Sequence, residues 1–556
     1  MINLSGKHLK LSPLFVMLAA CSGGDAPTPE LADYGEPVHG GTAVIAEGAD
    51  MSMPLTIVGQ TVLDGSLGGD VLYMSMLATD WGDGRLVYRT ADESPMAIAR
   101  RYEYLGPDSA SLRFHMRSDL RWSDGEPITA EDVLYTYDLI GDPELASPVQ
   151  DYTDEIEGVE AEDDSTVVFH FTRRYPDMLT DASMAIIPEH VFGNTSASEF
   201  RSHTALLDPT NGNLVVSGPY MIGSWQRSER IVLERNPEFE PRAYLDQLVF
   251  RVIPEPTTRI VELQTGAVDF VKGVTFDQIP QLRGQAPNVR FETEEKRAYD
   301  YVGYNGAGFE PFADPEIRRA LGLAIDAPSM IEALQMEEFA VPAGGPYPPI
   351  FRDLYDPQGQ APVGYDPDES RSILESKGWS DTNGDGVLDR DGQPFRFTLV
   401  TNAGNQRRAD IAQIIQDQWR RIGVDAQIQI REFNTLTEEL TAGNFQAVVA
   451  GWNVGLSPDL SPLWSEESPF NYTNYTAPGL ADLIEEARTA PTPETAAPLW
   501  RQAASRIVSD QPYTWLFYMD VVDGVNNRLR ETEVDTYGAY QNTWEWWIPE
   551  ELRRGE

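Results

Sequence analysis

The segment around Trp452 carries side chains that could hold a ligand. Its indole ring offers a flat apolar wall, and the neighbouring Asn453 can both donate and accept hydrogen bonds, a combination that suits peptide or sugar ligands. An apolar run at residues 447–450 predicts a strand that ends just before this pair, and Gly451 and Gly455 flank it. The pattern favours a loop tip at the edge of a cleft. The alternative is that Trp452 belongs to the core.

A second segment has the oxygen-bearing side chains of a calcium loop. They stand at positions 1, 3, 5 and 9 of the loop, and a glycine stands at position 6. Position 12, where such loops need a bidentate Glu, is Gly392. Asn-Gly and Asp-Gly pairs also mark hairpin turns, so we expect no metal here and keep calcium as the weaker alternative. The four candidate ligands are Asp381, Asn383, Asp385 and Asp389.

The usual signatures of catalysis are missing from the sequence. There are six histidines without a His-x-x-x-His pair and a single cysteine, which argues against a transition-metal site. No Gly-x-Ser-x-Gly motif appears, which argues against a serine hydrolase. Carboxylate pairs are common, but a chain with 88 acidic residues contains such pairs by chance. We therefore expect neither an enzyme nor a bound cofactor.

The one cysteine, Cys21, stands at a position suited to lipid attachment. It follows a basic region and a short apolar run, and the residues Leu-Ala-Ala-Cys at 18–21 resemble the bacterial lipobox. By that resemblance, residues 1–20 are a lipoprotein signal peptide and Cys21 is the acylated first residue of the mature protein, held in a lipid bilayer by several chains. Residues 21–37 are small and proline-rich, which predicts a flexible tether.

The elements that position these residues alternate between strands and helices, which predicts an α/β fold. Residues 112–117 and 167–171 have the pattern of strands, and Thr129 with Asp132 marks the start of a helix. The clearest unit runs from Ile411 to Ile430: an apolar helical stripe, Gly423 as its end, and then an alternating strand.

Length and charge narrow the class of protein. A chain of 556 residues is too long for one core, so two or three domains are expected. The net charge of −46 repels phosphates, which excludes nucleic acid as a partner. No apolar run is long enough to span a bilayer.

An ordered series of motifs resembles the family 5 (peptide/nickel-type) extracellular solute-binding proteins of ABC importers. The most recognisable is SDGEPITAEDV at residues 123–133, and the series ends with GWNVGLSPD at residues 451–459. Between them, matching segments lie at residues 217–220, 233–237, 259–269, 301–305, 311–326, 365–367, 377–379 and 411–430.

The resemblance implies two lobes of the type II periplasmic-binding-protein kind that close on a ligand, with an extra inserted domain. Lobe I is expected at residues 38–60, 208–296 and 519–556, the inserted domain at 61–207, and lobe II at 297–518. The implied role is a monomeric substrate-binding subunit in the bacterial cell envelope, anchored at the periplasmic or extracellular face of a membrane. It captures a peptide-like solute by hinge closure and delivers it to an ABC permease and its ATPase.

The resemblance also bears on the ligand. In some oligopeptide-binding members an Asp three residues after the Trp takes the ligand's α-ammonium group, but here that position is Gly455. Either Asp459 takes the amine in a longer site, or the ligand has no free α-amine. We favour the second reading, with a long, modified or non-peptide ligand such as an oligosaccharide. Further candidate ligand-binding residues are Tyr304, Asn305 and Tyr347.

Three other functions stay open at this point. They are a sensory binding protein that serves a receptor without an importer, an oligosaccharide-binding member of the same family, and a secreted hydrolase. A neighbouring permease gene would favour the importer over the sensor, and turnover of any ligand would favour the hydrolase.

Overall fold

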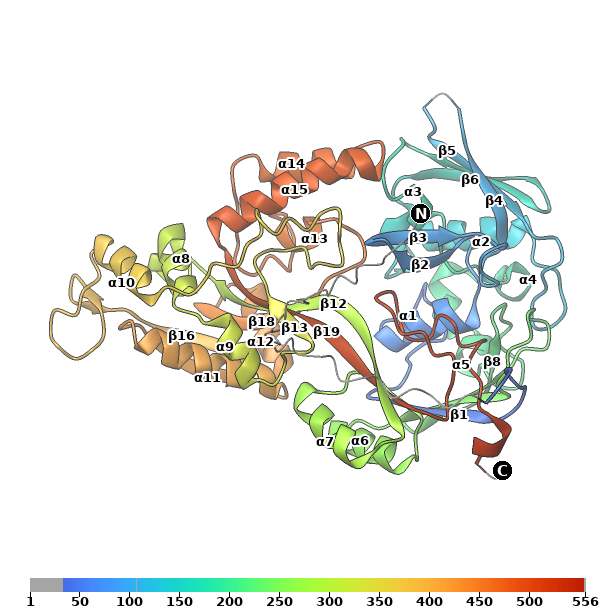
Figure 1. Ribbon diagram of the computed structural model, residues 1–556. Helices are drawn as coiled ribbons and strands as arrows, with labels where there is room; N and C mark the ends of the chain where they lie inside the picture. Colours follow the sequence, from blue (N-terminus) through green and yellow to red (C-terminus); the bar gives the residue numbers. More distant parts are fainter. Residues whose placement is uncertain (1–33, 107, 555–556) are drawn as a thin grey trace, which may run out of the picture. The chain divides into compact units, whose positions relative to one another are not determined.

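A computed structural model describes residues 34–106 and 108–554. The proposed signal peptide, Cys21 and most of the proposed tether lie outside these residues. From Gly35 onward the chain forms one structural unit. It is a mixed α/β structure, as the sequence predicts (Figure 1).

The main feature is an eleven-stranded sheet. Its strands lie in the order β17-β16-β18-β12-β19-β11-β1-β10-β9-β8, and β13 pairs with β19 beside this path. The strands are β1 (Thr42–Glu47), β8 (Tyr220–Gln226), β9 (Arg230–Arg235), β10 (Gln247–Val252), β11 (Phe270–Val271), β12 (Val289–Tyr304), β13 (Ala340–Pro342), β16 (Arg396–Asn402), β17 (Asp425–Arg431), β18 (Ala447–Asn453) and β19 (Tyr513–Asn526).

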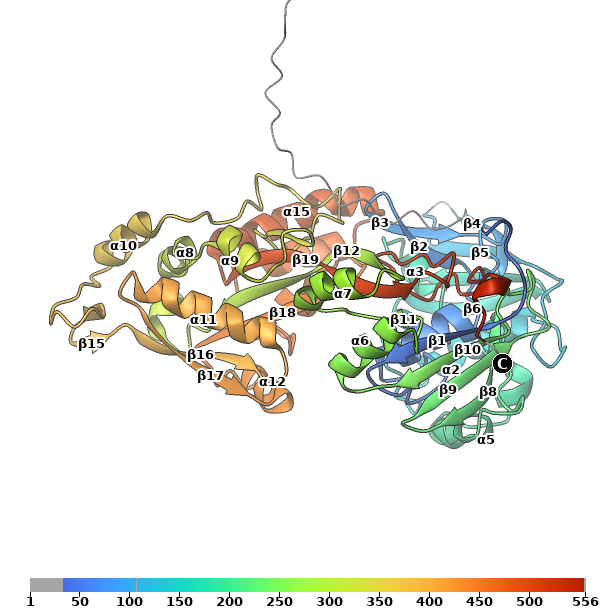
Figure 2. The same ribbon diagram turned by 60° about the horizontal axis from the view of Figure 1, so that its bottom comes forward.

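Two long strands, β12 and β19, connect the two parts of this sheet. They run antiparallel to each other, and Figures 1 and 2 show them side by side in light green and red. The first part of β12 pairs with β19 alone, whereas residues 298–304 also pair with β18. The register shifts between Glu294 and Ala298, so this pair contains an irregularity of the β-bulge kind. On one side of this pair the sheet continues through β11, β1, β10, β9 and β8. On the other side it continues through β18, β16 and β17.

A separate four-stranded sheet lies within the segment expected to be the inserted domain. Its order is β4 (Ala99–Leu105), β5 (Ser111–Met116), β7 (Thr166–Phe171) and β6 (Ile156–Asp163), so both predicted strands of this segment form. Helix α2 (Ala130–Gly141) begins with a capping box between Thr129 and Asp132, which confirms the predicted start. A hairpin of β2 (Ala78–Gly82) and β3 (Arg85–Arg89) precedes this sheet.

The unit predicted from Ile411 to Ile430 forms as expected. Helix α11 (Gln406–Arg420) buries Ile411, Ile415 and Trp419, and Gly423 adopts a left-handed conformation (φ +81°) just before β17. Strand β17 then runs parallel to β16. A small hairpin joins β14 (Asp389–Arg390) and β15 (Gln393–Pro394).

The other α-helices are short except for α15. They are α1 (Val62–Leu67), α3 (Met178–Asp181), α4 (Glu189–Phe192), α5 (Thr204–Leu207), α6 (Pro256–Thr265), α7 (Ile279–Gln285), α8 (Pro315–Leu323), α9 (Ala327–Ala333), α10 (Pro367–Ser376), α12 (Phe433–Thr441), α13 (Ser461–Trp464), α14 (Leu480–Arg488) and α15 (Pro493–Asp510). A short π-helix lies at η1 (Gly68–Leu72), and short 3-10 helices lie at η2 (Gln150–Thr153), η3 (Ala197–Ser202), η4 (Phe276–Gln278), η5 (Glu310–Ala313) and η6 (Glu550–Leu552).

Candidate functional site

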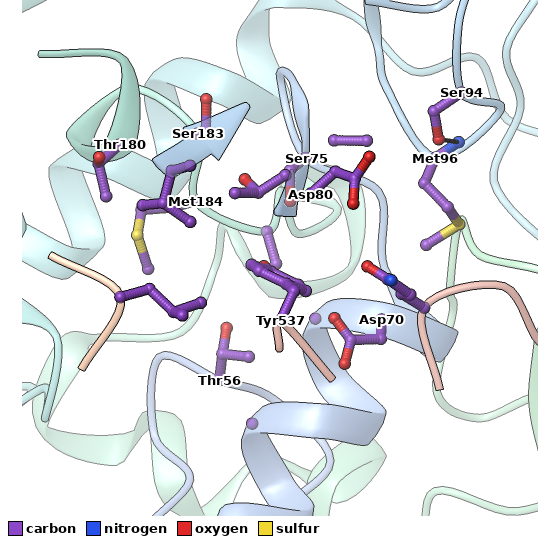
Figure 3. Close-up of a pocket in the computed structure, with 18 of the residues that line it drawn as sticks. Thr56, Asp70, Ser75, Asp80, Ser94, Met96, Thr180, Ser183, Met184 and Tyr537 are labelled. Atoms are coloured by element: carbon purple, nitrogen blue, oxygen red, sulfur yellow. Dashed lines mark hydrogen bonds between the residues drawn. The ribbon is translucent and has the colours of Figure 1, made fainter. Parts of the chain in front are cut away.

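A cavity of about 870 Å³ brings together segments that are far apart in the sequence. Residues between 56 and 96 and between 148 and 185 form much of its wall, and residues 533–545 near the C-terminus form another part. Leu456 and Ser457, in the loop after β18, and Arg297, in β12, complete it. Figure 3 shows the middle of this cavity, where Asp70, Asp80 and Tyr537 lie near one another. A cavity of this size holds a ligand of several residues.

Acidic side chains outnumber basic ones on the cavity wall. The basic residues are Arg89 and Arg297, and both are already engaged. Arg89 donates to Asp80 at 3.2 Å from Nε and 2.9 Å from Nη2, and its Nη1 lies 3.8 Å from Glu93 Oε1. The carboxylates on the wall are those of Asp70, Asp80, Glu93, Glu533 and Glu545.

Arg297 connects two segments that line the cavity, the loop after β18 and the C-terminal segment. It lies in the irregular stretch of β12 between Glu294 and Ala298, where the strand departs from regular pairing. Its Nε donates to the carbonyl of Val454 at 2.8 Å, and its Nη1 donates to the carbonyl of Thr536 at 2.9 Å. One guanidinium therefore joins the loop after β18 to the C-terminal segment, because its planar fork can serve two carbonyls at once.

Charged groups are gathered on β12, on β19 and just after β11. The Nζ atom of Lys272 is 3.1 Å from Glu294 Oε1, and the fully buried Asp523 accepts a hydrogen bond from the amide of Gly273 at 2.9 Å. Burial, together with the nearby Glu294, raises the pKa of Asp523 to about 8. Burial alone would lower the pKa of Lys272, but Glu294, Asp523 and Glu47 outweigh it and raise that pKa. One ammonium group thus serves several carboxylates.

The β2–β3 hairpin makes a second connection across the molecule. Trp81 meets Phe351 edge to face, with ring centroids 5.4 Å apart, and Arg352 Nη1 lies 3.6 Å from Asp83 Oδ1. The turn of the hairpin has positive φ at both central residues, +53° at Asp83 and +81° at Gly84, as two-residue hairpin turns require. A Cβ on Gly84 would lie 2.6 Å from the amide nitrogen of Arg352, so the two backbones are in close contact.

A smaller cavity of about 210 Å³ contains Trp452 and Asn453. It lies between the segment 273–276 and the start of α11, where Arg407 and Arg408 are found. Arg407 donates to Asp300 Oδ2 at 2.8 Å and Arg408 to Asp300 Oδ1 at 3.2 Å. Trp452 stacks on Tyr472 with centroids 5.6 Å apart, and Asn453 is exposed. The expected loop tip is wrong, because β18 continues through Trp452 and Asn453 and both residues pair with β12. The pair ends a strand and borders a cavity.

Comparison with known proteins now identifies the family. The sequence profile of the bacterial extracellular solute-binding proteins, family 5 Middle, matches residues 74–474. The chain belongs to this family. The oligopeptide-binding protein AppA of Bacillus subtilis (strain 168) is 27% identical over 561 residues, which cover 97% of each chain. The expected family and the two-lobed fold class are thereby confirmed.

Solved structures of this family support the fold. The structure of AppA from Bacillus subtilis in complex with a nonapeptide matches with a TM-score of 0.74 and 25% identity, over 92% of this chain and all of that chain. The ABC transporter substrate-binding protein CtaP from Listeria monocytogenes matches with a TM-score of 0.78 and 20% identity over the same shares. In the described part of this family 5 protein, the helices are too short or too polar to cross a membrane.

Asp459 is already satisfied in this family 5 protein. Its carboxylate accepts hydrogen bonds from the amide of Ser461 at 2.7 Å and from the Ser461 hydroxyl at 2.9 Å, and Arg488 Nε lies 3.2 Å from Oδ2. A carboxylate with these partners has little need of a ligand amine. Tyr347, also expected at the ligand, is buried, and its hydroxyl donates to the carbonyl of Pro458 at 2.6 Å. Tyr347 therefore holds the loop that contains Pro458, and it is not among the residues that line either cavity.

Tyr304 and Asn305 must be corrected: the structure places both in the core. Tyr304 is at the end of β12, and its hydroxyl lies 2.9 Å from the Thr514 hydroxyl. The amide of Asn305 donates to the carbonyls of Gly443 and Phe445, each at 2.9 Å. Neither residue borders the two cavities described above.

The candidate calcium loop is a turn held by its own backbone. Asp381 accepts hydrogen bonds from the amides of Gly384 and Gly386, and Asp389 accepts from the amide and hydroxyl of Thr382. Asn383 and Asp385 accept from amides two residues further on. Within the described residues, these side chains form no group of three acidic or histidine ligands that could hold a metal ion.

The sequence reasoning did not find the main residues of the large cavity. Asp70, Tyr537 and Arg89 lie in no recognisable motif, and each is one of many residues of its type. The hint available was positional: Leu456 and Ser457 follow Trp452 and Asn453, which the sequence did single out.

Proposed function

We propose that this protein is the substrate-binding subunit of an ABC importer and that it binds a peptide or peptide-like solute in the large cavity. The observation that carries the proposal is the construction of this cavity. Its wall takes residues from the predicted inserted domain, from lobe II at Arg297 and Leu456, and from lobe I near the C-terminus. A site assembled from three separate parts forms fully only when those parts come together, which suits capture by closure.

The relatives point to peptides. AppA of Bacillus subtilis is named as an oligopeptide-binding protein, and its matching structure holds a nonapeptide. The polar lining of the cavity here, with its carboxylates, hydroxyls and the aromatic rings of Tyr152, Tyr537 and Trp544, provides the hydrogen-bonding groups that a peptide backbone needs. The smaller cavity at Trp452 and Asn453 extends the proposed binding surface beyond β18.

The remaining parts of the proposal concern assembly and location. We place the protein at the outer face of a bacterial membrane, as a monomer held by acylated Cys21 and residues 21–37. In this arrangement an ABC permease and its ATPase receive the ligand from the closed form. The irregular stretch of β12 supports the lobe boundary that we propose near residues 296 and 297, because a change in strand direction costs less where regular pairing is interrupted.

Peptide retention tests this function. The purified protein is mixed with synthetic nonapeptides drawn at random from Ala, Gly, Ser, Leu and Tyr, prepared with free N-termini, with N-acetyl groups, and with N-acetyl groups plus one Lys. After gel filtration, mass spectrometry should find peptide from at least one mixture with the protein, and the peptide should be intact. Failure to retain any of the three would contradict the peptide proposal, and cleaved peptides would favour a hydrolase.

A further inference from the structure

The carboxylate of Asp70 borders the large cavity and has no partner. Asp70 lies in η1, where its neighbours Val71 and Leu72 are fully buried and fix the backbone. Among the residues that the structure describes, none donates a hydrogen bond to this carboxylate or forms an ion pair with it. In Figure 3 it lies in the same part of the cavity as Tyr537. Asp70 is half-buried and faces the cavity, so a ligand that covers its carboxylate must also pair with it, because an unpaired buried carboxylate is costly.

The nearby cations cannot serve Asp70. Lys272 lowers the pKa of Asp70, but its ammonium group already lies beside Glu294 and near Asp523 and Glu47. Arg89 is bound to Asp80, and Arg297 is bound to two backbone carbonyls. Asp535 adds another negative charge close to Asp70. This part of the cavity is therefore short of positive charge.

An aromatic ring stands next to this carboxylate. Tyr537 lines the cavity and is half-buried. The next residue is Gly538, and a Cβ built on it would lie only 3.7 Å from Asp70 Oδ2. The loop at residues 537–538 thus passes directly beside Asp70. The face of an aromatic ring attracts cations, and a carboxylate attracts them more strongly, so the two together select a positively charged group.

We propose that Asp70 is a specificity-determining residue that binds a protonated amine or guanidinium group of the ligand, with the ring of Tyr537 as a second contact. This inference rests on the proposed function, because it takes the large cavity as the site of the peptide. It also replaces the expectation, based on the loop after Trp452 alone, that the ligand lacks a free amine. The cation of the ligand is bound by Asp70 in η1 instead of by a residue of the loop after Trp452.

Binding of a cation at Asp70 should release a proton. Without ligand, burial raises the pKa of Asp70 to about 7, with Lys272 lowering it and Asp535 raising it further, so near pH 7 the carboxyl is partly protonated. A cation beside the carboxylate favours the ionised form and lowers this pKa again. Peptide binding at pH 7 should therefore release about half a proton per ligand, since about half of the carboxyl groups are protonated at that pH.

The three nonapeptide mixtures described above test the inference, together with the isosteric variant Asp70→Asn. The wild-type protein should retain the mixture with free N-termini, the mixture with Lys, or both, at least about tenfold more than the N-acetylated mixture without Lys. In Asp70→Asn this preference should disappear, while some peptide is still bound. Asp138→Asn is the matched control, because Asp138 is exposed on α2 and the substitution removes the same charge far from the cavity wall.

A pH-stat measurement at pH 7 provides a second readout, which reports proton release instead of peptide retention. Addition of the preferred mixture to the wild-type protein should release protons in proportion to the peptide bound, and Asp70→Asn should release markedly fewer. Equal retention of charged and N-acetylated mixtures by the wild type would overturn the role of Asp70 but leave the peptide function standing. An unchanged preference in Asp70→Asn would overturn it as well. Retention of no mixture would contradict the peptide function, and the inference with it.

Discussion

Asp523 is a buried residue whose charge should affect stability. It is fully buried on β19, and burial together with Glu294 raises its pKa to about 8, against an ordinary value near 4. Between these two values the unfolded chain has released this proton and the folded protein still holds it. The folded state therefore binds more protons, and the free energy of unfolding falls as pH rises from about 4 to 8. Below pH 4 both states are protonated, and this effect vanishes.

Asp523→Asn removes this cost while keeping an oxygen that can accept from the amide of Gly273. We expect the variant to be more stable than the wild type at pH 8.5, by about 1–3 kcal/mol, and to differ little at pH 4.5. Urea unfolding at the two pH values measures the difference, with Asp138→Asn as the surface control. A stability difference that is equal at both pH values would show that the carboxyl is ionised throughout.

Cys21 carries the prediction on the membrane anchor. In the wild-type protein expressed in a bacterial host, the mature chain should begin at Cys21 and partition into the detergent phase. Cys21→Ala should remain uncut or should appear in the aqueous phase, because a single change removes both the cleavage site and the acyl chains. The measurement is mass spectrometry of the N-terminus after phase separation. An intact Met1 start in membrane-bound wild-type protein would show that the anchor is something else.

The residue scale also shows the limit of sequence reading. The apolar run before Trp452 and Asn453 is a local signal that correctly predicts a strand next to a cavity, but it places the end of the strand before this pair, whereas β18 includes both residues. The engagement of Asp459 by Arg488 could not be predicted, because the two residues are 29 positions apart and pair only in the folded chain. Asp70 was equally hidden: nothing local separates it from the other acidic residues.

At the scale of elements, the β2–β3 hairpin acts as a contact between the predicted inserted domain and lobe II. Gly84 at its turn lies so close to the backbone that an added Cβ would be 2.6 Å from the nitrogen of Arg352 and 2.8 Å from the oxygen of Ile350. Gly84→Ala should therefore force the hairpin away from residues 350–352. If the ligand is held by closure of these parts, we expect affinity for the retained nonapeptides to fall by about tenfold or more.

The positive φ of Gly84 adds a backbone cost that has nothing to do with this contact, and Gly212→Ala controls for it. Gly212 has almost the same φ, +78° against +81°, but a Cβ there meets nothing within 4 Å. Both variants should share a loss of about 1 kcal/mol of stability from the left-handed conformation, and Gly84→Ala should lose more because of its contact. Equilibrium binding by both should separate the two effects. Equal affinities would mean that the hairpin contact plays no part in ligand binding.

Elements with local signals were predicted well, and those set by long-range pairing were not. The helix and strand between Ile411 and Ile430 follow from apolar spacing and one glycine, and both form. The lengths of β12 and β19, 16 and 14 residues, depend on their pairing with each other across more than 200 residues of sequence. Neither the irregularity at Glu294 nor the placement of Arg297 in the cavity wall could be read from the chain.

For the whole molecule, β12 and β19 decide how the parts can move. They are continuous through both parts of the large sheet, so a relative rotation of the lobes must be absorbed along these two strands. The register shift between Glu294 and Ala298 marks a place where regular pairing is already interrupted. Bending there disturbs fewer regular hydrogen bonds than bending within the paired stretches on either side. Arg297, in the same stretch, then holds the loop after β18 to the C-terminal segment.

This arrangement predicts a measurable closure in solution. The chain without its first 21 residues should show a smaller radius of gyration in X-ray scattering when the retained nonapeptides are added, because the ligand joins walls contributed by separate parts of the chain. The variant Gly84→Ala should show a smaller decrease at saturating peptide, since its added methyl group opposes the contact between the hairpin and residues 350–352. Gly212→Ala should close as the wild type does. A radius that stays the same at saturation in the wild type would mean that the ligand enters a cavity already closed, and the capture mechanism would then need a different moving part.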